Sequence, residues 1–328
     1  MAFIFLSVYR GRDGTLIPTQ VKQYLSESKY KMAIPTDSHS DRTEKSANQS
    51  MAKALVVEGG ALRGVFSTGI MDGFLEKRFN PFDFYVGVSS GASNLAAFLA
   101  EMIGRNKRIY TDYSLRPKFI DPVRFLRGGH LMDLDWLWDT TIREIRLDLQ
   151  RIYTKGKPFI VVLTDVQSGK AVYKETGAQD LEHVLKASSA MPLFYRSHPI
   201  VDGRKTTDGG VADAIPIGKA IGLGARRIMV IRSRSGDYLK RRDPFDCLVR
   251  WSMRRYPALQ QTMTKRVSRY NESVNLIRKP PEGVTIVEIC PPKRFRVSRL
   301  SQNRSILEEG YNQGRALAAH AIALWDGA

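Results

Sequence analysis

The 328-residue sequence contains only two cysteines, Cys247 and Cys290. Two cysteines are too few for the disulfide framework of a small secreted fold, and no CxxC spacing indicates a zinc site. We expect both thiols to be free. The sequence also lacks any apolar run near the roughly 18 residues that span a bilayer. Residues 2–9 are apolar, but no basic residue precedes them, so we predict no signal peptide and expect a cytoplasmic protein.

The first fifty residues lack any recognisable motif. Residues 31–52 are polar, rich in Ser, Asp and Lys, and without periodicity, which is typical of a linker or a disordered tail. We therefore expect residues 1–52 to be a polar, disordered N-terminal extension. The extension is either dispensable or absent because translation starts at Met51.

A short glycine-serine motif, Gly87-Val88-Ser89-Ser90-Gly91, identifies a candidate nucleophile. Residues 82–88 read as a buried strand and residues 92–102 as a helix. A serine at the centre of such a strand-to-helix turn has its hydroxyl exposed, and the helix directs backbone N–H groups towards it. Ser89 therefore fits a nucleophile, and the alternative is a glycine-rich loop without chemistry.

A second glycine-rich turn lies upstream. Residues 53–57 form an apolar run, Glu58 to Gly64 read EGGALRG, and residues 65–77 indicate a helix. Backbone N–H groups in such a loop suit an oxyanion hole, where each donor stabilises the transition state by about 3 to 4 kcal/mol. A nucleotide phosphate loop is the rival interpretation, but it requires a Gly-Lys-Ser/Thr or a later acidic residue that the sequence lacks.

A carboxylate near the middle of the chain is the candidate proton acceptor for Ser89. Asp208 stands in Thr207-Asp208-Gly209-Gly210-Val211. In isolation, an Asp-Gly-Gly sequence is more often a turn whose carboxylate accepts backbone N–H bonds.

These three motifs, EGGALRG, GVSSG and DGGVADAIP, resemble in this order and separation the patatin-like phospholipase family. The resemblance covers about residues 53–230. The chain also resembles the bacterial branch of this family in three longer segments: NPFDFYVGVSSGASN, DPVRFLRGGHLMDLDWL and KASSAMPLFYRS. It implies an α/β fold, a three-layer α/β/α arrangement with a mainly parallel central sheet. It also implies a serine lipid acyl hydrolase with no cofactor and no metal.

Transferred by position, the resemblance makes Ser89 the nucleophile and Asp208 its proton acceptor, in a dyad without histidine that works through an acyl-enzyme. The substrate would be a phospholipid, a lysophospholipid or another lipid ester. The oxyanion hole would be formed by the N–H groups of Gly59, Gly60, Ala61, Leu62, Arg63 and Gly64. The glycines that support the motifs are Gly87, Gly91, Gly209 and Gly210.

The chain departs from the family pattern at Ala61, which replaces the third glycine of a Gly-Gly-Gly run, and at Glu58 before the run. If the backbone at Ala61 has a positive φ, its Cβ costs about 1 kcal/mol or moves the loop. A second class of function stays open on this ground: a catalytically decayed, basic module that binds lipid or nucleic acid.

A Ser-His-acid triad is the competing mechanism. In ordinary α/β-hydrolases the histidine follows the acid in the sequence, and only His320 follows Asp208. His320 lies in an Ala-rich helical pattern, where a lone histidine is more often a packing or surface residue.

The chain divides on composition into the extension, a catalytic domain at residues 53–233 and a basic C-terminal region at residues 234–328 that packs on it. Residues 159–165, 182–188 and 227–231 continue the strand and helix alternation, with a helix at 215–224. Beyond them, residues 284–289 predict a further strand and residues 301–325 a long helix.

Positive charge concentrates at residues 226–269, with thirteen Lys or Arg against three Asp within a total net charge of +18. Trp251, Tyr256 and Tyr270 lie between the basic residues. For a lipid hydrolase, we predict peripheral binding of the 226–270 segment to the anionic inner membrane face, where each basic residue near the surface contributes about 1 kcal/mol. A solvated helical face is the plain alternative, and no specific nucleic acid is predicted.

Two further groups of residues lie just before the middle of the chain. Trp136 and Trp138 fit an acyl groove, although core packing is the more common use of such aromatics. Asp133, Asp135 and Asp139 do not have the ligand spacing and turn glycine of a Ca²⁺ loop, so we predict no metal.

Overall fold

The computed structural model describes residues 9–10, 16–17, 51–242 and 246–328, and separates Met1–Ser50 from a compact unit, Met51–Ala328. In the first unit, β1 (Tyr9–Arg10) and β2 (Leu16–Ile17) pair antiparallel. The expected disorder of the extension concerns residues that lie almost entirely outside this description, so it stays a prediction.

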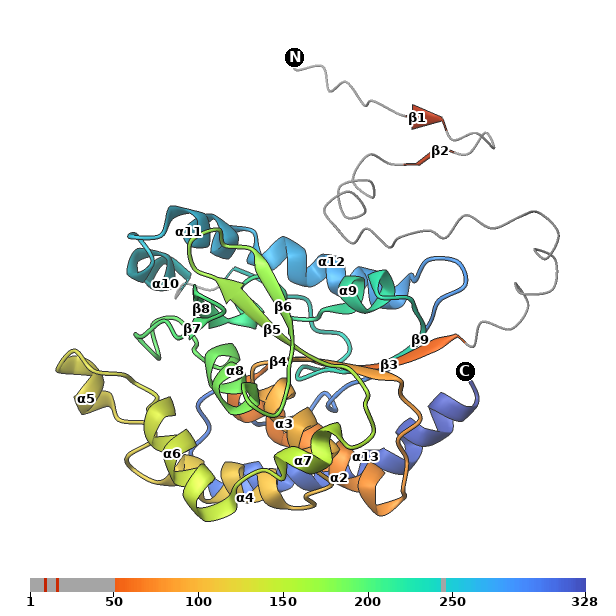
Figure 1. Cartoon of the computed structure of the whole chain (residues 1–328), viewed down its shortest axis with the longest axis horizontal. Coiled ribbons are helices and arrows are strands. Elements are labelled where there is room, and N and C mark those ends of the chain that lie inside the picture. The colour runs from red at the N-terminus through yellow and green to blue at the C-terminus, as the bar shows by residue number, and fades with distance from the viewer. Residues whose placement is uncertain (1–8, 11–15, 18–50, 243–245) are drawn as a thin grey trace. The chain divides into compact units, whose positions relative to one another are not determined.

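The compact unit is built on one mixed sheet (Figure 1). Its strand order is β10-β9-β3-β4-β5-β8-β7, with β6 also paired to β5. The pairs from β10 to β5 are parallel, whereas β6, β8 and β7 join in antiparallel pairing. The strands are β3 (Ala52–Val57), β4 (Phe84–Val88), β5 (Phe159–Asp165), β6 (Ala171–Glu175), β7 (Ile200–Val201), β8 (Arg204–Asp208), β9 (Ala225–Ile231) and β10 (Thr285–Ile289).

Helices cover both faces of the sheet because the central strands are apolar on both sides. On β3, Leu55 and Val57 belong to one buried cluster, and Ala54 and Val56 to another. Successive strand residues point to opposite faces, and continuous apolar strands are typical of a parallel sheet between two helical layers. The predicted α/β fold with a mainly parallel central sheet is confirmed.

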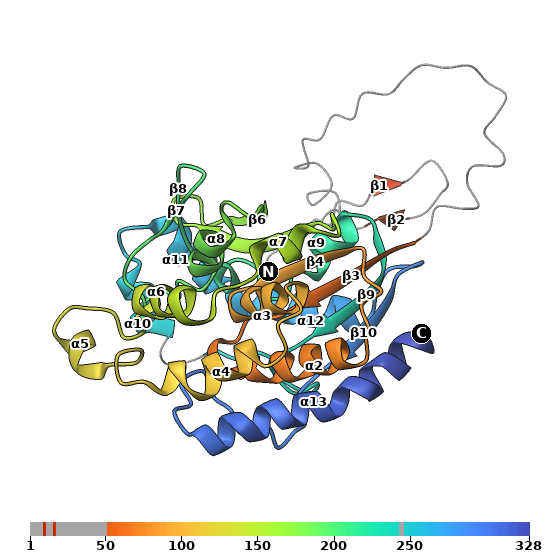
Figure 2. The same ribbon diagram turned by 60° about the horizontal axis from the view of Figure 1, so that its bottom comes forward.

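The first helical layer contains α2 and α3 with the helices that lie beside them, and the second contains α9 and α12 (Figures 1 and 2). The helices are α2 (Val65–Glu76), α3 (Ser90–Leu99), α4 (Arg105–Thr111), α5 (Pro122–Leu126), α6 (Leu134–Ile145), α7 (Leu149–Tyr153), α8 (Leu181–Ser188), α9 (Ile217–Gly222), α10 (Asp246–Ser252), α11 (Pro257–Thr264), α12 (Arg266–Arg278) and α13 (Arg304–Asp326).

The last helix packs unusually closely on the first long one. A Cβ added at Gly69 of α2 would lie 2.1 Å from the carbonyl oxygen of Tyr311, and one at Gly314 of α13 would lie 2.1 Å from that of Phe66. Only glycine allows the two backbones to approach in this way. Tyr311 also donates its hydroxyl to Asp72, 2.9 Å away. Helix α2 is therefore fixed against α13 along much of its length.

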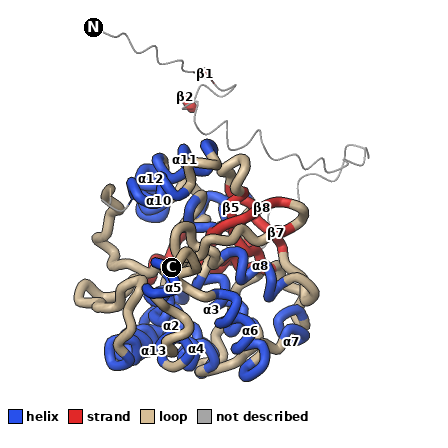
Figure 3. The backbone as a smooth tube through the Cα atoms, turned by 90° about the vertical axis from the view of Figure 1, so that its left-hand side faces the viewer, coloured by secondary structure: helices blue, strands red, loops and turns tan. Residues whose placement is uncertain are grey.

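Within the described ranges, no helix has both the length and the apolar character required to cross a membrane. Figure 3 views the molecule from the side on which α5 projects, with α10, α11 and α12 above it and α2, α4 and α13 below.

Candidate active site

Ser89 occupies the sharp turn between β4 and α3. Its backbone has φ 53° and ψ −127°, a conformation that residues other than glycine rarely adopt. Strain of this kind persists only where the surroundings hold it, and here the Ser89 N–H donates to the hydroxyl of Ser188 at 2.8 Å. The turn thus presents a serine that is only 6% exposed at the start of a helix.

Asp208 reaches the same place from a distant part of the sequence. Strand β5 lies between β4 and β8, and its neighbouring residues Val162 and Leu163 pair with Val88 and Asp208 respectively. Asp208 is 7% exposed, and its Oδ1 accepts the Gly210 N–H at 2.7 Å. Burial raises the pKa of its carboxyl above the ordinary 3.8, against hydrogen bonds from the Ser89 hydroxyl and Gly210 N–H. A carboxyl with a raised pKa is a better proton acceptor.

The segment between α8 and β8 holds both residues. Ser188, which receives the Ser89 N–H, donates its own hydroxyl to the Val162 carbonyl at 2.7 Å. The Ala190 carbonyl accepts the Asp208 N–H at 3.0 Å. In the sequence these residues stand out only as part of KASSAMPLFYRS. The role of Ser188 could not be predicted, because a buried serine hydroxyl that bridges two strands has no local sequence signal.

The glycine-rich loop lies directly against the nucleophile. A Cβ at Gly59 would lie 2.9 Å from the Ser89 Cβ, so only glycine fits there. Several N–H groups of the loop are already used: Gly60 donates to the Ser90 hydroxyl, Leu62 to the Arg299 carbonyl, and Arg63 to the Gly60 carbonyl. In the part of the chain that the structure describes, the N–H groups of Gly59 and Ala61 have no acceptor.

The backbone at Ala61 has a positive φ of 50°, the conformation in which an alanine is strained relative to glycine. Ala61 starts the short 3-10 helix η1 (Ala61–Gly64), which leads directly into α2. Gly64 closes that turn, and its carbonyl accepts the amide of Asn94 at 2.7 Å, which ties the loop to α3. Of the other motif glycines, Gly87 lies on β4, Gly91 on α3, and Gly209 and Gly210 on the turn after β8.

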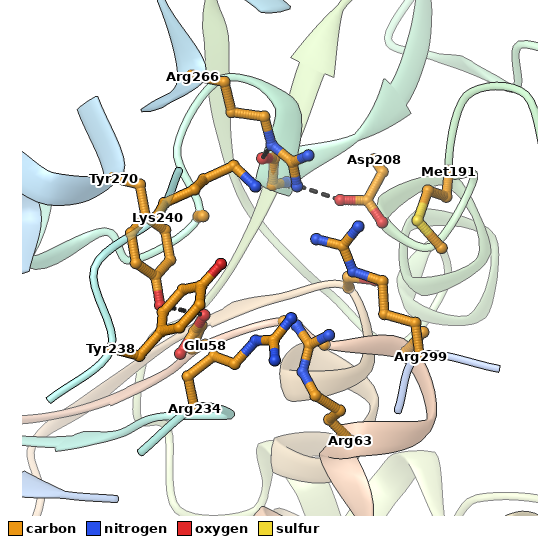
Figure 4. Close-up of a pocket in the computed structure, with 16 residues that line it drawn as sticks. Glu58, Arg63, Met191, Asp208, Arg234, Tyr238, Lys240, Arg266, Tyr270 and Arg299 are labelled. Carbon is orange, nitrogen blue, oxygen red and sulfur yellow. Dashed lines mark hydrogen bonds between the residues drawn. The ribbon is translucent and has the colours of Figure 1, made fainter. Parts of the chain in front are cut away.

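A basic cavity lies on the Asp208 side of Ser89 (Figure 4). Its cationic side chains come from separate elements and converge on one space: Arg63, Arg234, Lys240, Arg266 and Arg299. Arg63 is 4% exposed, and its Nε has no partner among the described residues. Burial, together with the nearby Arg299 and Arg234, lowers the pKa of Arg63 to about 9. The cavity therefore holds positive charge at an electrostatic cost.

Glu58, the second departure from the family pattern, joins the loop to the C-terminal region. Its carboxylate accepts the Ser233 N–H at 2.8 Å and the Tyr270 hydroxyl at 3.1 Å. Arg232 is fully buried beside it, 3.8 Å away, and also binds Glu288 at 2.6 Å. The residue before the glycine run therefore has structural partners just after β9 and in α12.

An apolar pocket opens on the other side of Ser89. Its walls include Ile109, Phe119, Met132, Leu134, Leu137 and Trp138, and it shares Ala61, Ser89 and Met191 with the basic cavity. The space between its walls, open solvent included, is about 790 Å³. Trp138 lines the pocket and also packs on the core, whereas Trp136 only packs on the core.

The remaining candidates of the sequence analysis lie elsewhere. His320 is an exposed residue of α13, and no histidine is among the described residues that line either cavity. Asp133 accepts the Trp136 N–H at the start of α6, and Asp135 binds Lys186 and Tyr195. Cys290 has a free thiol; the side chain of Cys247 lies outside the described residues.

The basic segment at 226–270 is not a single surface. Arg232 is buried, Arg266 donates its Nε to the Gly210 carbonyl at 2.8 Å, and Arg269 donates to the Ala212 carbonyl at 2.9 Å. Only part of the segment, including Arg254 and Arg255, is exposed. Much of the charge that the sequence analysis assigned to a surface therefore lies near Asp208.

Two family models match the chain. Residues 55–221 match the model described as patatin-like phospholipase, and residues 256–326 match a domain of unknown function, DUF6363. The first matched region contains Ser89, Asp208 and Arg63, and the second contains Arg266 and Arg299. Both regions therefore contribute to the basic cavity.

Known proteins resemble the chain over different lengths. The uncharacterized protein YjjU of Escherichia coli is 35% identical over 274 residues, or 82% of this chain and 77% of that protein. An uncharacterized NTE family protein of Mycobacterium tuberculosis is 26% identical over 52% of this chain and 46% of its own. The crystal structure of VipD from Legionella pneumophila aligns with a TM-score of 0.45 and 13% identity, covering 84% of this chain and 67% of that one.

Proposed function

The chain belongs to the patatin-like phospholipase family, a family of lipid hydrolases, and we propose that it hydrolyses lipid esters with a Ser89-Asp208 dyad. The observation that carries this proposal is the position of Ser89. It is held on a strained turn and lines, together with a buried carboxyl whose pKa is raised, a basic cavity that meets an apolar pocket at this serine. An ester with an acyl chain and a polar head fits such a junction.

The reaction proceeds in two steps. The Ser89 hydroxyl attacks the ester carbonyl carbon while its proton passes to Asp208, and the N–H groups of Gly59 and Ala61 stabilise the oxyanion. The alcohol leaves with the proton from Asp208, which gives an acyl-enzyme. Water then loses a proton to the same carboxylate, attacks the acyl carbon and releases the fatty acid with regeneration of the Ser89 hydroxyl.

Labelling by a fluorophosphonate probe tests the dyad, together with fatty-acid release from mixed phospholipids. We expect the wild type to be labelled and to release fatty acid, Ser89→Ala to lose both, and Asp208→Asn to lose release. Ser268→Ala is the control, because Ser268 is an exposed serine of α12 that lines neither cavity. A wild type without labelling or release would favour the decayed binding module instead.

We also propose that the enzyme acts at an anionic membrane face, but through a narrower region than residues 226–270. Trp251 on α10 is 61% exposed with the Arg254 guanidinium over its ring, and Leu126 on α5 is 84% exposed. Figures 1 and 3 place α5 and α10 at the same end of the molecule. Exposed apolar residues beside basic ones suit the interface of an anionic bilayer.

Sedimentation with vesicles tests this part separately. Binding should be stronger to vesicles that contain anionic lipid, and the double change Leu126→Asp with Trp251→Ala should weaken it. Leu324→Asp, at a half-exposed leucine of α13, is the control for a new surface charge. Equal binding of the double variant and the wild type would contradict a role for α5 and α10.

A further inference from the structure

The two residues that begin the glycine-rich loop have no backbone preference of their own. Neither Gly59 nor Gly60 carries a side chain, so the peptide group between them turns freely unless hydrogen bonds hold it. Both ends of this peptide group are held. The Gly59 carbonyl accepts the Ser233 hydroxyl at 3.0 Å, and the Gly60 N–H donates to the Ser90 hydroxyl at 2.9 Å. Two serines outside the loop therefore set its orientation.

Ser233 also touches the loop directly. A Cβ added at Gly60 would lie 2.8 Å from both Cβ and Oγ of Ser233. On the other side, a Cβ added at Gly59 would lie 2.9 Å from that of Ser89. The start of the loop is thus held between the nucleophile and Ser233. Since the Ser233 hydroxyl accepts the Arg63 guanidinium at 3.4 Å, its own proton remains available for the Gly59 carbonyl.

Ser233 is itself held in place through Glu58. Its N–H donates to Glu58 Oε2 at 2.8 Å, and Glu58 Oε1 accepts the Tyr270 hydroxyl at 3.1 Å (Figure 4). Tyr270 is fixed in turn, because its hydroxyl accepts Nη2 of Arg232 at 2.9 Å. All four side chains are buried, so water does not compete for these hydrogen bonds. A continuous hydrogen-bonded chain therefore joins α12 to the loop beside the nucleophile.

We propose that Ser233 and Tyr270 are positioning residues for the oxyanion hole. Ser233 orients the peptide group between Gly59 and Gly60, and Tyr270 orients Ser233 through Glu58. Neither side chain contacts the reacting atoms; each acts by holding backbone N–H groups in the direction that an oxyanion requires. Because the bound ester carries no oxyanion, donors of this kind act in the transition state and not in substrate binding.

This inference rests on the proposed hydrolase function, in which the N–H groups of Gly59 and Ala61 stabilise the oxyanion. It also gives a role to the second matched region, residues 256–326, whose family model is of unknown function. Tyr270 connects that region to the residue directly before the glycine-rich loop. We therefore expect the region to contribute to turnover rather than to binding of the ester.

Steady-state kinetics with one soluble ester, p-nitrophenyl butyrate, tests both residues. Ser233→Ala removes one hydroxyl and should lower kcat about 100-fold, the usual effect of a small misplacement in a site. Tyr270→Phe removes a hydroxyl one step further from the loop and should lower kcat about tenfold, the contribution of one hydrogen bond. KM should change less than about threefold in both variants. A higher KM with unchanged kcat would overturn the proposal.

The double variant tests whether Tyr270 acts through Ser233. If it does, adding Tyr270→Phe to Ser233→Ala should lower kcat by no more than about twofold further, since changes within one hydrogen-bonded chain are not additive. A further tenfold loss would contradict this route and remove Tyr270 from the proposal.

Two control variants make the same chemical changes away from the loop. Thr111→Val removes a buried hydroxyl that donates to the Lys107 carbonyl at 2.9 Å. Tyr153→Phe removes a hydroxyl that donates to Thr176 at 2.9 Å. Neither Thr111 nor Tyr153 lines either cavity, so both variants should keep the wild-type kcat and KM. A loss of kcat in the controls as large as in the test variants would indicate general destabilisation and defeat the proposal.

A trifluoromethyl ketone separates oxyanion stabilisation from other binding. The Ser89 oxygen adds to its carbonyl carbon, the hydroxyl proton passes to Asp208, and the carbonyl oxygen becomes an oxyanion. Ser233→Ala should weaken this inhibitor about 100-fold, the same factor by which it lowers kcat/KM. The matched alcohol, which forms no adduct, should bind the variant and the wild type equally. Equal weakening of both ligands would exclude a specific effect on the oxyanion.

Amide hydrogen exchange tests the inference without any turnover. The N–H groups of Gly60 and Arg63 are hydrogen-bonded in the wild type, and in Ser233→Ala they should exchange about tenfold faster, because the loop opens more easily. Those of β4 should keep their rates. Unchanged exchange in the loop would overturn the inference. A wild type that hydrolyses no ester, with faster exchange in the variant, would defeat the proposed function alone.

Discussion

The two cavities beside Ser89 are built in opposite ways. The apolar pocket is lined mainly by residues 105–147, which are near one another in the sequence, whereas the basic cavity gathers side chains from Glu58 to Arg299. Apolar walls need only packing, but converging cations must be held by many elements because they repel one another. The difference indicates that the shape of the apolar pocket depends on a local segment, whereas that of the basic cavity depends on the whole compact unit.

Replacing the Asp208 carboxylate, on the basic side of Ser89, should cause the largest loss of activity. Asp208→Asn should lower kcat about 10²- to 10⁴-fold, the usual contribution of a general base, because amides do not accept the proton. Fatty-acid binding in the apolar pocket should persist, as measured by calorimetry. Activity within tenfold of the wild type would exclude Asp208 as the proton acceptor.

The same variant should be more stable than the wild type. Since the folded pKa of Asp208 is raised, its ionisation disfavours the folded state at pH values above the unfolded pKa of about 3.9. The gain, about 0.5 to 2 kcal/mol, should be present at neutral pH and vanish as the pH falls below both pKa values. Urea unfolding at pH 7 and at about pH 3, below both pKa values, measures it.

Filling the apolar pocket should impair the hydrolysis of long-chain esters. Ile109→Trp places an indole where about four methylenes of an acyl chain would lie, and each buried methylene contributes about 0.8 kcal/mol. kcat/KM for long-chain esters should fall roughly 100-fold, with little change for butyrate esters. Ile103→Trp, at an exposed isoleucine before α4, is the control. An equal loss for short and long chains would indicate misfolding instead.

The two cavities should also respond differently to pH, because Asp208 titrates whereas the apolar side chains of the pocket do not. With a neutral ester, kcat/KM should rise with pH through the pKa of Asp208, with a midpoint above the ordinary 3.8. Acyl-chain preference should stay constant across the same range. A midpoint at or below 3.8 would contradict the effect of burial on this carboxyl.

The smallest effect is expected at Ala61, which lines both cavities. Its positive φ costs about 1 kcal/mol relative to glycine, so Ala61→Gly should stabilise the fold by about that amount and change turnover only a few-fold. Ala319→Gly, at an exposed position in the middle of α13, should instead destabilise the fold by about 1 kcal/mol. Chemical unfolding compares the two, and a destabilised Ala61→Gly would contradict the strain.

Local features of the site could be predicted from the sequence. The strand, turn and helix around Ser89 follow from residues within twenty positions, and the structure has β4 and α3 where the pattern places them. The strain at Ala61 could also be predicted locally, because it depends only on the φ of that one residue. Asp208 was already a candidate from its Asp-Gly-Gly sequence, but only the family motif paired it with Ser89, because its approach depends on antiparallel pairing of β8 with β5.

The basic cavity could not be predicted from the sequence. A count of lysines and arginines gives the charge of a segment but not the direction of each side chain. Arg234 and Arg266 therefore appeared as part of a surface, although both line the basic cavity (Figure 4). Arg299 follows the counted segment and carried no signal at all.

The close packing of α13 on α2 has a consequence for the timing of activity during synthesis. Helix α2 begins where the loop of Gly59 and Ala61 ends, and α13 is the last described element to leave the ribosome. A nascent chain that already contains Ser89 and Asp208 still lacks the support that fixes α2, and it lacks Arg299. We therefore expect a growing chain to be unable to attack cellular lipids until its final helix has docked.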